Sequence, residues 1–276
     1  MGERFTIRRA QRKQARFRCG IAGPSGSGKT YSAILLAMGL ATDPSKIAVI
    51  DTEHNSAELY DHLCEWSHLG LDAPYTADRY IDALKQCEDE GFEVVIIDSI
   101  SHLWSGTGGL LQQKELAERR GKNAYTAWGE VTPKFEQFVE AILSSKCHVI
   151  CTMRSKTHYA LISDDKTGRT KVTKLGLKPI QREGIDYEFT MMLEMNGEDN
   201  SAVVTKNRTG LFEGEPFVPS PEAGRIIREW LESGAAETPL KEEPRRAPPT
   251  EIHVGSDEPD FDVVANDPED EGGDLF

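Results

Sequence analysis

The sequence predicts an α/β domain with a mostly parallel central sheet that is covered by helices on both faces. Apolar runs typical of buried strands alternate with segments of helical periodicity, and this alternation is the pattern of parallel sheets. A Gly-rich turn, "GPSGSGKT" (residues 23–30), follows the first apolar run. The 276 residues fit one domain of about 230 residues with a tail.

The first half of the chain alternates strands and helices. Apolar runs predict buried strands at residues 15–23, 46–51 and 92–99. Helical spacing of apolar residues predicts helices at Thr30–Ala41, 57–69, 79–90 and near 109–120. Residues 100–131 otherwise consist of a Ser/Gly-rich loop.

The second half begins with Thr132 and Pro133, which suit the N-cap and first turn of an amphipathic helix. Residues 147–153 form the next predicted strand. Residues 155–182 lack a helical period and predict a β-hairpin or a mobile loop. Two further strands, "YEFTMMLEM" and "SAVVTK", precede a last helix that begins at Ser220-Pro221 and ends before Gly234.

Charge and composition divide the chain into a basic N-terminal segment (1–18), a core (19–234) and an acidic tail (235–276). The net charge is −14, and the tail holds 13 Asp and Glu against 3 Lys and Arg. Such a composition predicts disorder in the tail. An odd number of cysteines (5) argues against a disulfide framework. With no signal peptide and no long apolar run, we expect a cytoplasmic protein without a membrane partner.

The turn at residues 23–30 matches the phosphate-binding pattern G-x-x-x-x-G-K-[ST] between a predicted strand and a predicted helix. Its backbone N–H groups and the helix N-terminus are suited to bind the phosphates of ATP. Lys29 is expected to contact the β- and γ-phosphates. The predicted nucleotide-binding residues are Gly23, Pro24, Ser25, Gly26, Ser27, Gly28, Lys29, Thr30 and Tyr31.

A magnesium ion is expected beside the phosphates. Thr30 is positioned in the motif to bind Mg²⁺ directly. Asp98 ends the apolar run "VVIID", which is the Walker B arrangement of an acid at the carboxyl end of a central strand. We therefore expect Asp98 to hold Mg²⁺ through water.

A third acid, Glu53, follows the second predicted strand in "VIDTEHN". It is suited to orient or deprotonate the attacking water. This stretch resembles the bacterial RecA recombinase, which has Asp-Ala-Glu-His here, and the resemblance implies that Glu53 is the catalytic acid. Asp98-Ser99 is similar to the RecA Walker B segment as well. The resemblance covers residues 15–215 by motif order and is nearest to phage-encoded RecA-core ATPases of recombination and single-strand annealing.

The stretch "VVTKNRTG" (203–210) ends a predicted strand with two cations, Lys206 and Arg208. RecA has Lys-Asn-Lys at the similar position, and ring helicases of the DnaB type resemble this arrangement too. The resemblance implies that Lys206 and Arg208 are catalytic and act on the γ-phosphate held by a neighbouring subunit. The alternative is two solvated cations at a strand end. A ring or a filament of this chain is therefore expected.

The loop after the fourth strand of RecA-like proteins lines the DNA path. Here residues 154–182 hold eight Lys and Arg against two Asp, which suits phosphate binding, and two aromatic rings suit base stacking. The alternative is a solvated hairpin. The predicted contacts to single-stranded DNA are Arg154, Lys156, His158, Tyr159, Lys166, Arg169, Lys171, Lys174 and Lys178. RecA ends this strand with Asn-Gln, whereas "CTMRSK" stands here.

These observations predict an oligomeric, DNA-dependent ATPase of phage-type recombination or annealing, located in the host cytoplasm if phage-encoded. Alternatives are a helicase or helicase-loading motor, a small-molecule phosphotransferase, and an ATP-gated recruitment module.

The basic N-terminal segment is suited equally to DNA or to a neighbouring subunit. For the acidic tail three hypotheses stay open: docking to a single-stranded-DNA-binding or replication partner, competition with DNA for the basic loop, and solubilisation alone.

Overall fold

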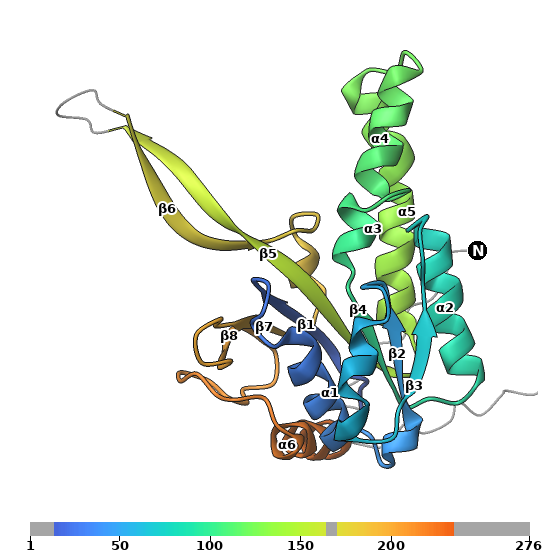
Figure 1. Ribbon diagram of the computed structural model, residues 1–276, viewed down its shortest axis with the longest axis vertical. Helices are drawn as coiled ribbons and strands as arrows, with labels where there is room; N and C mark the ends of the chain where they lie inside the picture. The colour runs from blue at the N-terminus through green and yellow to red at the C-terminus, as the bar shows by residue number, and fades with distance from the viewer. Residues whose placement is uncertain (1–13, 164–169, 235–276) are drawn as a thin grey trace, which may run out of the picture. The chain divides into compact units, whose positions relative to one another are not determined.

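The computed structural model describes residues 14–163 and 170–234 (Figure 1). The chain divides into two units, Met1–Glu237 and Thr238–Phe276, and all described residues belong to the first unit. The predictions for residues 1–13, for Lys166 and Arg169, and for the acidic tail lie outside the described residues.

The strands form one sheet in the order β3-β2-β4-β5-β1-β7-β8. Their bounds are β1 (Arg18–Gly23), β2 (Ile47–Asp51), β3 (Ser67–Gly70), β4 (Val94–Asp98), β5 (His148–Ser163), β7 (Met191–Met195) and β8 (Ala202–Asn207). All neighbours in this order are parallel except β8, which runs antiparallel to β7. The mostly parallel sheet predicted from the sequence is confirmed.

Helices cover both faces of the sheet. Their bounds are α1 (Lys29–Leu40), α2 (Ala77–Asp89), α3 (Ser101–Ser105), α4 (Leu110–Arg119), α5 (Ala124–Ser144) and α6 (Pro221–Glu232), with short 3₁₀ turns η1 (Pro44–Lys46), η2 (Ser56–Leu63) and η3 (Ile185–Tyr187). Successive side chains of a strand point to opposite faces. Ile97 of β4 therefore packs in a cluster with Tyr80 of α2, while Ile96 packs in a second cluster with Ile34 of α1 and Ile227 of α6.

The predicted helix over 57–69 is wrong in its second half. η2 ends at Leu63, and Ser67–Gly70 forms the edge strand β3, paired in parallel with β2 from Ala48 to Asp51. The side chains of β3 are exposed or half-buried, so the segment has little apolar periodicity of its own. Backbone pairing with β2 decides its structure, and that pairing is not encoded locally.

Thr132 and Pro133 do not begin a helix. α5 begins earlier, where the side chain of Asn123 accepts a hydrogen bond of 2.9 Å from the backbone N–H of Thr126, and Pro133 lies inside the helix. One buried stripe continues across the proline: Ala127, Val131, Phe135, Phe138 and Ile142. Packing of this stripe outweighs the loss of one backbone hydrogen bond at Pro133.

The basic segment after the sheet strand is a β-hairpin. β5 runs without a break past the predicted end at residue 153, and its outer half pairs antiparallel with β6 (Thr170–Pro179) from Ser155 to Ser163. Figure 1 shows this hairpin extending away from the sheet. Among the described residues, no helix is both long and apolar enough to cross a lipid bilayer.

The contact between α1 and α6 predicts a stability effect. A Cβ atom on Gly224 would lie 2.2 Å from the carbonyl oxygen of Leu36, and backbone cannot give way as a side chain can. Gly224→Ala should therefore lower the free energy of unfolding by about 1–3 kcal/mol, measured by urea denaturation. Gly129→Ala is the matched control: Gly129 lies within α5, and a Cβ there meets nothing within 4 Å. That variant should be unchanged or up to about 1 kcal/mol more stable; equal effects of the two substitutions would contradict the packing argument.

Candidate nucleotide-binding and catalytic site

The P-loop (Gly23–Thr30) connects β1 to α1. Gly26 and Gly28 have φ angles of 78° and 77°, in the left-handed region that favours glycine, and Gly28 is the N-cap of α1. The ammonium group of Lys29 donates a hydrogen bond of 2.7 Å to the Pro24 carbonyl, so it lies over the loop. This backbone shape, at a helix N-terminus, is suited to bind phosphates.

Tyr31 follows the P-loop on α1. Its side chain is 40% exposed, and its ring lies edge-on to Tyr60 of η2 with 5.7 Å between ring centroids. The structure thus places this predicted nucleotide-binding residue beside the loop, with an accessible ring.

The carboxylate of Asp98 lies at the carboxyl end of β4, where it is 2% exposed. The hydroxyl of Thr30 donates to Oδ2 at 2.5 Å, and the hydroxyl of Thr152 on β5 donates to Oδ1. Burial raises the pKa of Asp98, and the two hydroxyl groups act against this shift. No motif in the sequence points to Thr152; it is adjacent to Asp98 because β4 and β5 are neighbours.

These groups fit a magnesium ion. Hydroxyl and carboxylate oxygens are the hard ligands that Mg²⁺ prefers, and Thr30 and Asp98 are already in contact. Burial lowers the pKa of Lys29, while the carboxylates of Asp98 and Glu53 raise it. Lys29 and Thr30 of the P-loop and Asp98 of β4 therefore form one polar cluster, and bound Mg²⁺ would neutralise phosphate charge there.

Glu53 follows β2 in a turn that Asp51 organises. The Asp51 carboxylate accepts hydrogen bonds from the backbone N–H groups of Glu53 (2.6 Å) and Ala57 (2.9 Å). β4 is the neighbour of β2 in the sheet. The hydroxyl of Ser99, the residue that follows β4, donates to the Glu53 carboxylate at 3.0 Å. The structure therefore places Glu53 just past the end of β2, where the sequence predicts it, and brings it next to Ser99, the residue that follows Asp98.

Arg154 forms an ion pair with Glu53. Its guanidinium Nε donates to Glu53 Oε1 at 2.9 Å, and its terminal nitrogen pairs with Oε2. Burial by itself would raise the pKa of Glu53, but the Arg154 guanidinium outweighs burial and holds this pKa below its ordinary value. The sequence predicts a DNA contact for Arg154, whereas the structure places its side chain on Glu53. The signal in the sequence is a cation at the end of the strand that neighbours β4.

His102 of α3 completes this cluster and was missed from the sequence. Its Nδ1 is 2.8 Å from the Thr52 hydroxyl, and its Nε2 is 3.9 Å from Glu53 Oε1. The ring stacks on Tyr75 at 4.8 Å between centroids. Burial lowers the pKa of His102, although Glu53 acts in the opposite direction. A single His in a loop-rich segment carries no pattern that identifies it in a sequence.

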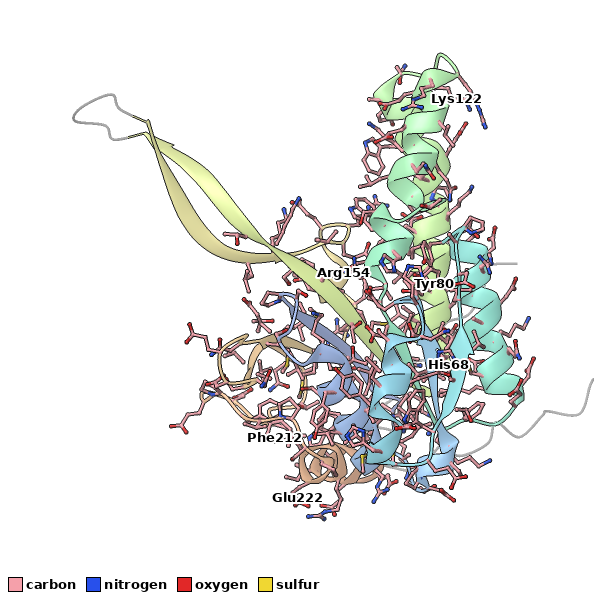
Figure 2. The ribbon with its side chains drawn as sticks, viewed as in Figure 1. His68, Tyr80, Lys122, Arg154, Phe212 and Glu222 are labelled. Carbon is pink, nitrogen blue, oxygen red and sulfur yellow. The ribbon has the colours of Figure 1, made fainter. Side chains whose placement is uncertain are left out.

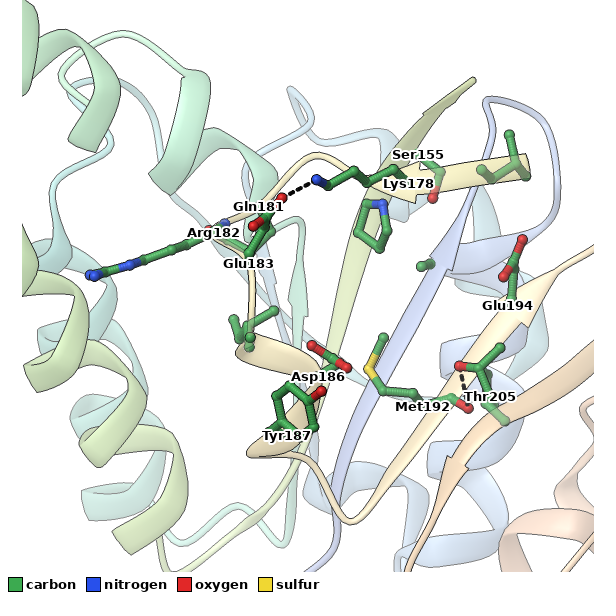
Figure 3. Close-up of a pocket in the computed structure, with 16 residues that line it drawn as sticks. Ser155, Lys178, Gln181, Arg182, Glu183, Asp186, Tyr187, Met192, Glu194 and Thr205 are labelled. Atoms are coloured by element: carbon green, nitrogen blue, oxygen red, sulfur yellow. Dashed lines mark hydrogen bonds and ion pairs between the residues drawn. The ribbon is translucent and has the colours of Figure 1, made fainter. Parts of the chain in front are cut away.

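Lys206 and Arg208 lie apart from the P-loop. Lys206 donates to the Asp186 carbonyl at 2.7 Å, and Arg208 donates to the Tyr187 carbonyl at 2.6 Å. Asp186 and Tyr187 line a cavity of about 490 Å³ between the base of the hairpin and strands β7 and β8 (Figure 3). The Tyr187 side chain is 70% exposed, so solvent reaches this part of the surface.

The remaining predicted DNA contacts belong to the hairpin. Lys156 lies on β5 directly opposite Lys178 of β6. Lys178 pairs with Glu183, while Lys156 is exposed. By backbone position His158 and Tyr159 belong to β5, and Lys171 and Lys174 to β6.

The hydroxyl of Thr152 generates a prediction about magnesium. Thr152→Val keeps the side-chain shape but removes a hydrogen bond to Asp98, which favours the protonated carboxyl. The Mg²⁺ concentration needed for half-maximal binding of a fluorescent ATP analogue should rise about 10- to 100-fold. Thr42→Val, whose hydroxyl contacts Glu93 instead, should not change it. An unaltered Mg²⁺ requirement in Thr152→Val would contradict a role for this contact.

The chain is similar to a known protein family in sequence and to a known protein in structure. In structure, the chain is similar to an ATPase from the type III secretion system of pathogenic bacteria, with 14% identity, a TM-score of 0.34, and coverage of 65% of this chain and 51% of that one. The chain thus spans about half the length of that protein. No curated protein matches the sequence. Residues 15–218 match the family described as an AAA domain, and because this match covers most of the chain, the chain belongs to the AAA domain family of P-loop ATPases.

Proposed function

We propose that this chain is an oligomeric, DNA-dependent ATPase of the RecA type that acts in phage-type homologous recombination or single-strand annealing. The observation that carries the proposal is the distribution of charge over the sheet. Lys29, Asp98 and Glu53 meet at one end of the sheet, while Lys206 and Arg208 lie toward the other end.

The chemistry is hydrolysis of the phosphoanhydride bond between the β- and γ-phosphates of ATP. The P-loop amides and Lys29 bind the phosphates. Glu53 accepts a proton from water as the water oxygen attacks the γ-phosphorus and the bond to the bridging oxygen breaks. Mg²⁺ supplies charge neutralisation when it is bound at Thr30 and Asp98.

The position of Arg208 supports catalysis between subunits. Its backbone N–H donates to the Thr190 carbonyl, and the Thr190 N–H donates to the Arg18 carbonyl, so Arg208 is level with the start of β1. Gly23 is five residues further along β1, which corresponds to roughly 16 Å along the strand, with two strand spacings of about 4.8 Å across the sheet. An arginine side chain is too short for that distance. This distance excludes the phosphates of its own P-loop, and it supports the proposal that Arg208 acts on the phosphates of another subunit.

The hairpin supports nucleic acid as the partner. Lys156 and Lys178 are cross-strand neighbours, and like charges directly opposite each other destabilise a sheet. Lys178 already pairs with Glu183, so a phosphate backbone would chiefly balance the charge of the exposed Lys156. Further along the hairpin, Lys171 is opposite Ile162 and Lys174 is opposite Tyr159. The hairpin thus carries several lysines and an aromatic residue, the combination found in surfaces that bind single strands.

The assignment of Arg208 predicts complementation between variants. Arg208→Ala should lose turnover by a factor on the order of 10³ while keeping ATP affinity, because its own P-loop is intact. Mixing it with Glu53→Ala subunits should restore activity, since some interfaces then combine an intact Glu53 with an intact Arg208. Turnover per subunit of the native protein should also rise with protein concentration.

The control for complementation is a mixture of Arg208→Ala with the double variant Glu53→Ala/Arg208→Ala, in which no subunit supplies Arg208. This mixture should stay inactive. Failure of the first mixture to recover any turnover would remove the assignment between subunits.

The hairpin lysines predict a change in the salt dependence of DNA binding. Single-stranded DNA should stimulate ATP turnover. Replacing Lys156 and Lys178 by Ala should reduce the slope of log affinity against log salt by about 0.7 for each lost phosphate contact, measured by fluorescence anisotropy of a labelled oligonucleotide. Lys134→Ala, on α5, should leave the slope unchanged. A normal slope in the double variant would show that the hairpin does not bind the backbone.

A further inference from the structure

Arg154 stands where the sheet and the hairpin meet. It is the last residue of β5 that pairs with β1, opposite Gly23 at the start of the P-loop. The next residue, Ser155, is the first that pairs with β6, opposite Pro179. Figure 2 shows Arg154 at the point where β5 leaves the sheet. One continuous strand therefore connects the candidate DNA surface to the candidate ATP site.

The side chain of Arg154 engages both oxygens of Glu53. Ser99 donates to Oε1 of the same carboxylate at 3.0 Å. A general base needs an oxygen that is free to accept a proton from water. In this arrangement both oxygens of Glu53 accept hydrogen bonds from protein donors, and Arg154 binds the carboxylate through both of them.

The backbone of Arg154 is fastened on both sides. Its N–H donates to the Ser101 hydroxyl at 2.9 Å, and its carbonyl accepts from the N–H of Ile180, just beyond β6, at 2.7 Å. The side chain of Gln181 then donates to the Ile100 carbonyl at 2.9 Å. Both arms of the hairpin are thus tied to the segment that follows Asp98, so the base of the hairpin lies directly beside the ion pair of Arg154 and Glu53.

The ion pair is open enough to be broken. The Arg154 side chain is 48% exposed and that of Glu53 is 20% exposed. Pairs that water reaches contribute little net stability. Separating the two groups therefore costs little free energy, whereas a fully buried pair would resist separation.

We propose that Arg154 is a latch on Glu53: it holds the carboxylate in an inactive arrangement, and single-stranded nucleic acid bound along the hairpin releases it. The inference rests on the proposed function, because it takes Glu53 as the base. Arg154 is a positioning residue in this scheme, since it acts on the reaction through Glu53. DNA dependence of hydrolysis then originates in one ion pair.

The test is ATP turnover of Arg154→Gln in the full-length protein, with and without single-stranded DNA. Without DNA, its kcat should rise on the order of tenfold, within the range typical of coupling between sites, and the ratio of stimulated to unstimulated rate should fall toward one. Affinity for a fluorescent ATP analogue should not change. Arg154→Lys, which keeps the charge but loses the two-pronged contact, should give an intermediate ratio.

Two controls separate the latch from other effects. Lys134→Gln removes a cation that contacts Gln113 on α4 and should leave both rates unchanged. Glu53→Gln/Arg154→Gln should be inactive, which shows that the gain passes through Glu53. A DNA-free rate of Arg154→Gln at or below that of the native protein, with normal nucleotide affinity, would overturn the latch.

The same experiment distinguishes failure of the proposed function. If Glu53→Gln hydrolyses ATP as fast as the native protein, the assignment of the base is wrong and the latch is wrong with it. If Glu53→Gln is inactive but Arg154→Gln shows no gain without DNA, the ATPase assignment stands and only the latch is lost.

Discussion

The arrangement of the site depends on the buried carboxylate of Asp98. A carboxylate that is 2% exposed must be hydrogen-bonded, because an unpaired charge in the interior costs several kcal/mol. Thr30 of α1 and Thr152 of β5 provide those bonds. The requirement fixes the start of α1 against the ends of β4 and β5, so the P-loop and the candidate metal ligands keep one geometry.

A second set of hydrogen bonds positions Glu53 at the carboxyl ends of the same strands. β2 is the neighbour of β4, and the Thr52 backbone N–H donates to the Asp98 carbonyl at 2.7 Å. Asp51 then folds the chain back so that Glu53 reaches Ser99. In a parallel sheet the carboxyl ends of adjacent strands gather polar groups from distant parts of the chain, and the order β2-β4-β5-β1 assembles this cluster.

The antiparallel edge strand β8 places two cations at the end of the sheet that lies opposite the P-loop. Because β8 runs antiparallel to β7, Lys206 near the end of β8 and Arg208 just beyond it lie away from the P-loop. The long strand β5 does the opposite, since it continues past the P-loop level into the hairpin. Phosphate chemistry, its proposed partner cations and its proposed DNA surface therefore occupy separate places on one sheet, which suits control of hydrolysis by neighbours and ligands.

The sequence by itself determined the α/β class, the P-loop and the strand-terminal positions of Glu53 and Asp98. These features are local: a Gly-rich turn between a strand and a helix, and an acid at the end of an apolar run, are visible within a few residues. β3 and the true start of α5 were mispredicted, because pairing with β2 and the Asn123 cap outweigh local periodicity.

The contacts of Arg154, Thr152 and His102 were decided only by the tertiary structure. Arg154 and Glu53 are 101 residues apart in the chain and meet because β2, β4 and β5 are adjacent. Hydrogen bonds and ion pairs of this kind depend on strand order, and strand order follows from how the whole core is buried rather than from any single segment.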